Sequence, residues 1–131
     1  RMVKQGSGVI LMITATPARL AIPQCGGFGV ACAALEGLCR QLAAEVGPQG
    51  VRVVCLRSAG TPEVIDDTME RHAKSRATTR ESFQAELEQG MLLRRFPSLA
   101  EVGNIAAMMA SDLASPMTGT VANMTCDAIV D

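Results

Sequence analysis

The sequence predicts an α/β protein in which a parallel sheet of about three strands is flanked by helices. A helical segment at residues 29–46 separates two apolar, β-branched runs at 9–14 and 51–56, and strand, helix and strand in that order form a βαβ unit. A third short run at 121–125 follows another helical pattern. The chain has 131 residues, 48% of them hydrophobic, which fits a single domain spanning residues 1–131.

The first strand is expected at residues 9–14. This continuous apolar run lies between Gly6-Ser7-Gly8 and Pro17, a pattern typical of a strand that is buried on both faces. The second strand, 51–56, is almost as apolar. Strands of this kind belong to parallel sheets that are covered by helices on both sides.

The helix expected at residues 29–46 ends at Gly47-Pro48. It is apolar on most of its circumference, so we expect it to be buried on most sides, by its own sheet and by something else. One stripe at helical spacing holds Ala31, Leu35, Leu38, Leu42 and Val46, and the opposite face of the first half holds Val30, Cys32, Ala33 and Ala34.

Residues 63–90 form a polar, charged segment that predicts two helices. The first is expected at 63–74, and the second follows Thr78, where Thr78-x-x-Glu81 is a capping-box pattern and Gly90 a stop signal. This lid-like excursion either covers a cleft or is a solvated helical pair.

A second capping-box pattern, Ser98-x-x-Glu101, predicts the start of the last long helix. The apolar stripe expected on this helix holds Val102, Ile105, Ala106, Met109 and Leu113. Thr118-Gly119 then leads to the third strand at 121–125.

Charge and hydropathy exclude some partners. Twelve Lys and Arg against thirteen Asp and Glu give a net charge of -1, and no stretch is basic enough to bind a phosphate backbone, so we expect no nucleic acid partner. The longest apolar run, residues 9–13, is too short to cross a bilayer. We therefore expect no membrane association and a cytoplasmic location.

The five cysteines are scattered among Ala, Val and Leu, which favours reduced thiols packed as small hydrophobes. Cys25, Cys32 and Cys39 repeat every seven residues, but zinc ligands on a helix usually lie three or four residues apart and no histidine is near. We therefore expect no metal site. His72, the only histidine, lies in a charged run, and we assign it no role.

Three segments, in order, resemble the short-chain dehydrogenase/reductase family. Residues 6–16 resemble the strand that ends in the family's catalytic serine, residues 27–53 resemble the helix that carries Tyr-x-x-x-Lys together with the next strand, and residues 117–121 resemble the closing strand. The resemblance implies the C-terminal half of a Rossmann-like, doubly wound parallel sheet, of which the chain holds the last three strands.

The resemblance also identifies the catalytic positions of the family in this chain. Phe28 stands at the tyrosine position, Cys32 at the lysine position and Ala15 at the serine position. In the family the tyrosine is the general acid or base, the lysine lowers its pKa and binds ribose, and the serine holds the substrate oxygen. None of the three substitutes can do this, so we expect no catalytic residues. Thr14 and Thr16 carry hydroxyls, but without a proton donor they leave hydride transfer unassisted.

We also expect no cofactor-binding residues. The chain lacks the glycine-rich turn that holds pyrophosphate, and Gly26-Gly27-Phe28-Gly29 fits the entry to the helix but not the full motif spacing. Residues 57–62 replace an expected Pro-Gly pair, which puts the family's nicotinamide contacts in doubt. NAD(P) is implied by the resemblance alone.

Two functions follow as alternatives. The first is a self-associating module without dehydrogenase activity, a homodimer or tetramer formed through helix 29–46, the exposed edge of strand 9–14, or both. Family members commonly dimerise through that helix, and an edge strand with unpaired N–H and C=O groups favours pairing. The second is a fragment of an NAD(P)-dependent dehydrogenase/reductase that is active only with an N-terminal nucleotide-binding half. With either function, the chain is a natural short reading frame from Met2 or an artificial or incomplete piece of a longer protein.

Overall fold

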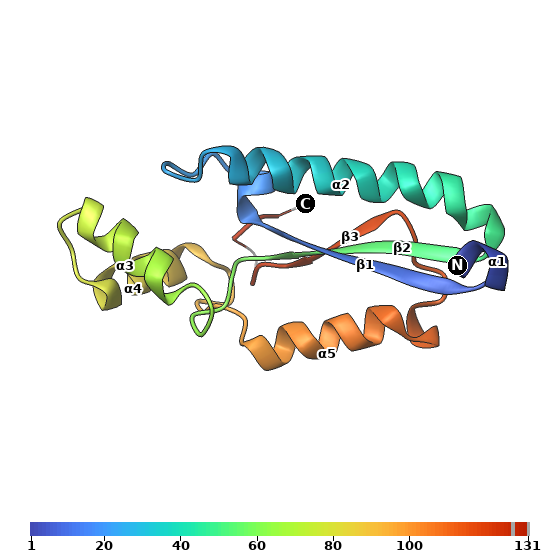
Figure 1. The fold of residues 1–131 in the computed structure, drawn as a ribbon. Coiled ribbons are helices and arrows are strands. Elements are labelled where there is room, and N and C mark those ends of the chain that lie inside the picture. Colours follow the sequence, from blue (N-terminus) through green and yellow to red (C-terminus); the bar gives the residue numbers. More distant parts are fainter. Residues whose placement is uncertain (127, 131) are drawn as a thin grey trace.

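The computed structural model describes residues 1–126 and 128–130, and its centre is a three-stranded parallel sheet (Figure 1). The strands are β1 (Gly8–Ala15), β2 (Val51–Ser58) and β3 (Thr120–Met124), in the order β1-β2-β3. Ala15 pairs with Ser58, and Ser58 pairs with Met124, so all three strands end at one edge. The predicted α/β class and the parallel sheet are confirmed.

Two helices cover the sheet, one on each face (Figure 1). The helix α2 (Gly27–Val46) lies on one face and α5 (Leu99–Ala110) on the other. Short elements join them: α1 (Met2–Gln5), η1 (Thr16–Ala18), η2 (Gly47–Gln49) and η3 (Asp112–Ala114). Each face has its own apolar cluster, one around Cys39 and Val53 under α2 and one around Leu56 and Met109 under α5.

The buried face of α2 differs from the predicted stripe. Its inward residues are Cys32, Glu36, Cys39 and Ala43, whereas Leu35 and Leu38 are 36% and 49% exposed. Because the helix is apolar nearly all round, hydropathy alone did not select a face. The small side chains of Cys32, Cys39 and Ala43 face the sheet instead.

The polar segment forms two helices beyond the carboxyl edge of the sheet (Figure 1). They are α3 (Asp66–Ser75) and α4 (Arg80–Gly90), and they pack around Phe83. The cap of α4 is Thr79, which accepts a hydrogen bond from the Ser82 N–H, so the predicted cap at Thr78 is wrong by one residue. That this pair acts as a lid stays a prediction.

The helix α5 begins as predicted. Ser98 and Glu101 form the reciprocal capping box, and Met109 of the predicted stripe is fully buried. Leu113 is 85% exposed, contrary to the prediction, because the helix ends at Ala110 and the chain turns into η3. No helix in the described part of the chain has the length and hydropathy needed to cross a membrane.

Candidate functional site at the carboxyl edge of the sheet

Polar side chains that are buried gather at the carboxyl edge of the sheet. In open α/β sheets this edge is where ligands usually bind, which makes it the candidate functional site. Among the described residues, Thr14 and Thr16 lie at or just after the end of β1, and Arg57, Ser58 and Thr61 lie at or just after the end of β2. Thr125 follows β3, and Glu36 faces the others from α2.

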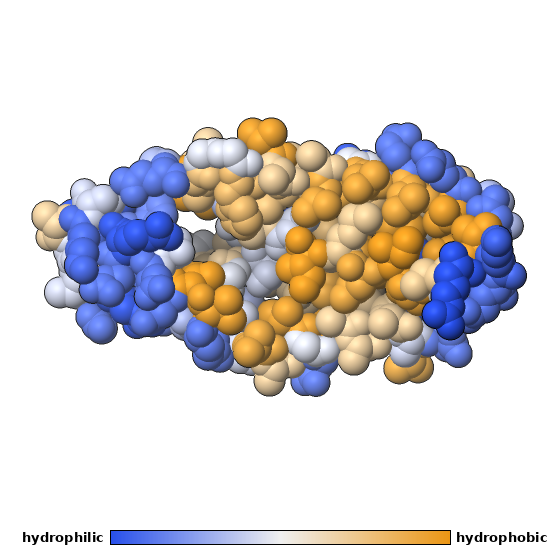
Figure 2. Space-filling view, in the orientation of Figure 1, coloured by the Kyte–Doolittle hydropathy of each residue, from blue (hydrophilic) through white to orange (hydrophobic). Residues whose placement is uncertain are grey.

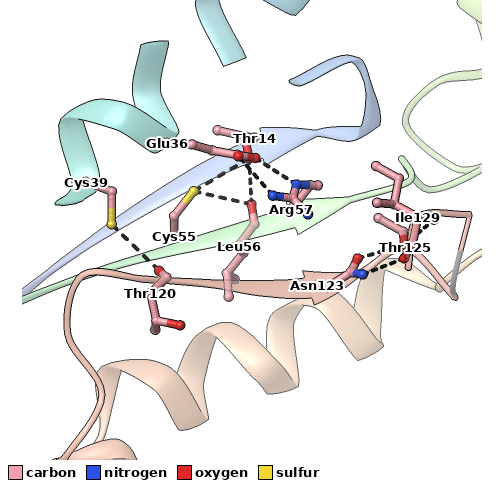
Figure 3. A network of polar contacts seen from close by, with 10 residues as sticks. All are labelled: Thr14, Glu36, Cys39, Cys55, Leu56, Arg57, Thr120, Asn123, Thr125 and Ile129. Carbon is pink, nitrogen blue, oxygen red and sulfur yellow. Dashed lines mark hydrogen bonds and ion pairs between the residues drawn. The ribbon is translucent and has the colours of Figure 1, made fainter. Parts of the chain in front are cut away.

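Thr14, Glu36 and Arg57 form one network at this edge (Figure 3). The Arg57 Nε–H donates to Glu36 Oε1 at 2.8 Å, and Arg57 Nη2 donates to Glu36 Oε2 at 2.9 Å. The Thr14 hydroxyl donates to Glu36 Oε1 at 3.0 Å. The Arg57 and Glu36 side chains are only 2% and 6% exposed, so this is a buried, two-pronged ion pair between β2 and α2.

The ion pair keeps Glu36 charged. The hydrogen bonds from Arg57 lower the pKa of the Glu36 carboxyl below its ordinary value, although burial opposes this, and the Thr14 hydrogen bond adds to the lowering. A carboxylate and a guanidinium held this closely neutralise each other. The edge of the sheet therefore carries no strong net charge at this point.

The three positions identified by resemblance lie on β1 and α2, the elements that also carry Thr14 and Glu36. Ala15 is the last residue of β1, and Phe28 and Cys32 lie in the first two turns of α2. The Phe28 side chain is 56% exposed, whereas Cys32 is 3% exposed and lies one turn before Glu36 on the same face. None of the three side chains carries a hydroxyl or a positive charge.

Glu36 and Arg57 were not among the residues singled out from the sequence. A signal for them exists, because Arg57 directly follows an apolar strand and a buried guanidinium needs an anionic partner. Glu36 is the carboxylate that shares a helix face with Cys32 and Cys39, at spacings of four and three residues. Pairing the two requires knowing which face of the helix is buried.

The thiols near this network are packing groups. Cys39 and Cys55 are fully buried, and burial raises the pKa of both thiols. Cys25, Cys32, Cys39 and Cys55 are not disulfide-bonded. The described residues contain no cluster of three or more His, Cys, Asp or Glu side chains that could hold a metal ion.

His72 lies far from the network, on α3. Its ring stacks on that of Phe83, with centroids 6.1 Å apart, and the Arg76 guanidinium lies 5.0 Å from the Phe83 centroid. No role was predicted for His72, and its side chain packs between α3 and α4.

A further set of contacts fixes the chain after β3 (Figure 3). The Asn123 side-chain amide donates to the Ile129 carbonyl at 2.7 Å, and the Thr125 hydroxyl donates to Asn123 Oδ1 at 2.7 Å. Thr125 is fully buried and Ile129 nearly so. These bonds hold Thr125 and Ile129 beside the end of β3.

The glycines at the start of α2 do not fit a dinucleotide cradle. Gly26, Gly27 and Gly29 lie at the start of α2. The phosphate cradle of a dinucleotide-binding fold lies in the turn between a strand and the helix that follows it. A Cβ at Gly29 would come within 2.8 Å of the Pro17 carbonyl oxygen, so this glycine permits close packing of α2 on η1. At Gly26 and Gly27 an added Cβ meets nothing within 4 Å. These three glycines therefore do not form a pyrophosphate site.

A shallow apolar groove lies beside the network, between η1 and the first turns of α2. Its volume is about 340 Å³, and its lining includes Pro17, Leu20, Ile22, Cys25 and Val30. The lining has no charged side chain. The groove can accommodate an apolar group but offers little to fix the orientation of a polar one.

Comparison with known proteins extends these observations. A family model described as enoyl-(acyl carrier protein) reductase matches residues 1–126. The chain is 33% identical over 122 residues to oxidoreductase UcpA of Salmonella typhimurium, a match that covers 91% of this chain and 45% of that protein. It is 41% identical over 101 residues to the enoyl-acyl-carrier-protein reductase (NADH) FabI of Nostoc sp., covering 77% and 36%.

A solved structure shows the same fold. Sorbitol-6-phosphate 2-dehydrogenase SrlD from Erwinia amylovora matches with a TM-score of 0.89 and 22% identity, over 99% of this chain and 52% of that chain. The chain spans less than half the length of the two curated relatives named above. This chain therefore corresponds to about half of the fold of these proteins.

Proposed function

Because the chain belongs to the short-chain dehydrogenase/reductase family, we propose that it is an oxidoreductase-type half-fold that has no dehydrogenase activity by itself and acts as a self-associating module. The observation that carries this proposal is the chemistry of Ala15, Phe28 and Cys32 at the carboxyl edge. The family's acid–base chemistry needs a phenol, an ammonium and a hydroxyl at these places. The chain supplies a methyl, a phenyl ring and a thiol.

The neighbouring polar groups do not replace the missing ones. Thr14 is 3% exposed and its hydroxyl already donates to Glu36, so it is not available to a substrate oxygen. The Arg57 guanidinium is a positive charge at this edge, but it is bound by both oxygens of Glu36. A proton donor with access to solvent is absent from this network of described residues.

Two exposed surfaces support self-association. The outer side of α2 presents Val30, 73% exposed, and the small residues Ala33 and Ala34, which permit close helix contact. The outer edge of β1 is the second surface, since β1 is the first strand of the sheet order. We propose a homo-oligomer formed through α2, the β1 edge, or both. The reduced thiols of the core fit a cytoplasmic location.

Native mass spectrometry and cofactor titration test the two parts separately. We expect an oligomer in the mass spectrum and no change in NADH or NADPH fluorescence when the protein is added at millimolar cofactor. A stable monomer would contradict the self-association. Saturable cofactor binding with turnover of a carbonyl or enoyl substrate would contradict the inactivity.

The second candidate function is an NAD(P)-dependent dehydrogenase/reductase that is completed by an N-terminal nucleotide-binding half. It is favoured by the relatives' length, because the match covers only 36% of an enzyme whose name specifies NADH. Reading the coding DNA upstream of Met2 for an in-frame glycine-rich segment tests it directly. If such a segment exists, the longer protein should be assayed with NADH and NADPH, and turnover would support this candidate over the first.

A further inference from the structure

The helical pair α3 and α4 has an apolar core of its own. Its buried side chains are Met69 and Ala73 of α3, Phe83 of α4, and Met91 and Phe96 beyond α4. None of these described residues belongs to the clusters under α2 and α5, which contain the buried residues of β2. Figure 2 shows a mainly hydrophilic surface over this end of the molecule, a mainly hydrophobic one over the sheet, and a hollow between them. The pair therefore packs as a unit beside the sheet and belongs to neither of its covering layers.

Polar contacts within this helical unit, residues 61–91, join its two helices. Arg80 at the start of α4 forms an ion pair with Asp66 at the start of α3. Arg76 Nη1 lies 3.3 Å from Glu86 Oε1, which links the end of α3 to the middle of α4. These contacts hold α3 and α4 to each other without any part of the sheet.

The helical unit joins the rest of the molecule at two chain crossings, one after β2 and one before α5. Each crossing contains a residue in the left-handed region, Gly60 with a φ of 88° and Arg94 with a φ of 55°. Beside the second crossing, the Leu93 N–H donates to the Cys126 carbonyl at 3.3 Å. Hinges are usually a few loop residues of this kind that absorb a change in φ and ψ. Both crossings are therefore suited to a rotation of the unit.

Thr61, next to Gly60 at the first crossing, has a buried hydroxyl that lacks a hydrogen-bond partner among the described residues. The residue is only 5% exposed. Its carbonyl accepts from the N–H groups of Val64 and Ile65, so the unpaired group is the side chain alone. Because the surrounding residues already enclose this oxygen, sequence outside the chain cannot reach it while the helical unit keeps its place. An enclosed hydroxyl of this kind raises the free energy of the arrangement that buries it.

We propose that the helical unit opens from the sheet as one body, about Gly60 and Arg94, and that the Thr61 hydroxyl sets how readily it opens. In the closed arrangement this hydroxyl has no partner, whereas in the open one water hydrates it. The two sheet clusters keep their packing during the motion, because they share no residue with the core of the unit. Opening exposes the carboxyl edge after β2, where open α/β sheets usually bind ligands. The motion does not depend on the proposed self-association.

Hydrogen exchange of the whole chain, measured by mass spectrometry at neutral pH, tests whether the unit opens separately. Amides of α3 and α4 should have protection factors at least about tenfold lower than those of β2, because they exchange by opening and the strand by global unfolding. Val53→Ala leaves a cavity in the cluster under α2, so it should lower the protection of β2 and leave that of α3 and α4 unchanged. Equal protection of helices and strand in the wild type, or an equal fall in Val53→Ala, would overturn the separate opening.

Substitutions at Thr61 test the role of its hydroxyl in the same measurement. Thr61→Val replaces the hydroxyl with a methyl group of similar size. It should raise the protection factors of both helices by roughly fivefold or more, since the closed arrangement loses its unpaired group. Thr61→Ser keeps the hydroxyl and is the matched control, in which protection should not rise.

The remaining outcomes count against the proposal. Unchanged or lower protection in Thr61→Val would mean that the hydroxyl has a partner, such as an ordered water, and would remove its role in opening. A rise in both Thr61→Val and Thr61→Ser would exclude the hydroxyl as the cause. A rise in Thr61→Val that is confined to α3 would show that the two helices do not move as one body.

Discussion

Arg57 and Glu36 meet in a buried pair in which two guanidinium nitrogens donate to the two carboxylate oxygens, at 2.8 and 2.9 Å. The pair joins the end of β2 to the middle of α2. It lies one helical turn from Cys32, at the edge where ligands usually bind in open α/β sheets. The Arg57 and Glu36 charges therefore hold the helix to the sheet.

Breaking this pair from one side should destabilise the fold strongly. Arg57→Met leaves the Glu36 carboxylate buried without its guanidinium, and we expect the free energy of unfolding to fall by about 3–5 kcal/mol. The double variant Arg57→Met with Glu36→Leu should recover most of this loss, because no buried charge remains. Urea unfolding followed by circular dichroism measures both. Glu45→Gln, at an exposed position of the same helix, is the control; equal losses in the single and double variants would contradict the argument.

Stability should also depend on pH through two carboxylates. Hydrogen bonds from Arg57 lower the pKa of Glu36, and those from Arg95 lower the pKa of Glu101 to about 2. A carboxyl whose pKa is lower in the folded state stabilises the fold above its unfolded pKa of about 4.3, and this contribution disappears as the pH falls through the folded pKa. The free energy of unfolding should therefore fall on acidification below about pH 5.

Variants separate the two groups. Glu36→Gln and Glu101→Gln should each flatten the acid limb of the stability curve measured by urea unfolding between pH 6 and 2. The flattening should be larger for Glu36→Gln, because Glu101 is exposed to solvent that screens its ion pair. A curve for Glu36→Gln that parallels the wild type would show that this carboxyl does not titrate with folding.

The turn after α3 offers a stabilising substitution. Ala77 has a φ of 53°, in the left-handed region, and its N–H donates to the Lys74 carbonyl at the end of the helix. Ala77→Gly should stabilise the fold by about 1 kcal/mol, because glycine adopts this conformation without the steric cost of a Cβ. Thermal unfolding measures the gain. Ala85→Gly, inside α4, should have the opposite sign, since glycine weakens a helix interior; a loss of stability in both variants would contradict the assigned turn.

Much of the fold was predictable because it is encoded locally. The three apolar runs gave the strands, and the reciprocal Ser98 and Glu101 side chains marked the start of α5. The inward face of α2 was not predictable, since Leu35 and Leu38 made an equally apolar alternative to Cys32 and Cys39. Because the inward face of α2 could not be predicted, the ion pair between Glu36 and Arg57 could not be predicted either.

The Glu36 and Arg57 pair joins residues 21 positions apart. Hydropathy periodicity describes what one element does by itself, and this contact depends on how α2 is rotated over β2. Once Cys32 and Cys39 face the sheet, Glu36 between them must face it too, and a buried carboxylate requires a partner. The site was therefore missed for the same physical reason as the helix face.

Restoring the family residues tests whether the carboxyl edge is arranged for catalysis. Phe28→Tyr should change the free energy of unfolding by less than about 0.5 kcal/mol, because the ring is 56% exposed and solvates the new hydroxyl. Cys32→Lys should cost several times more, since its side chain is 3% exposed and the Glu36 carboxylate one turn away is already bound by Arg57. The triple variant with Ala15→Ser should show no NADPH oxidation with carbonyl or enoyl substrates, because Gly26, Gly27 and Gly29 do not form a phosphate cradle. Turnover by that variant, measured by absorbance of the nicotinamide, would show that the edge keeps a working cofactor geometry.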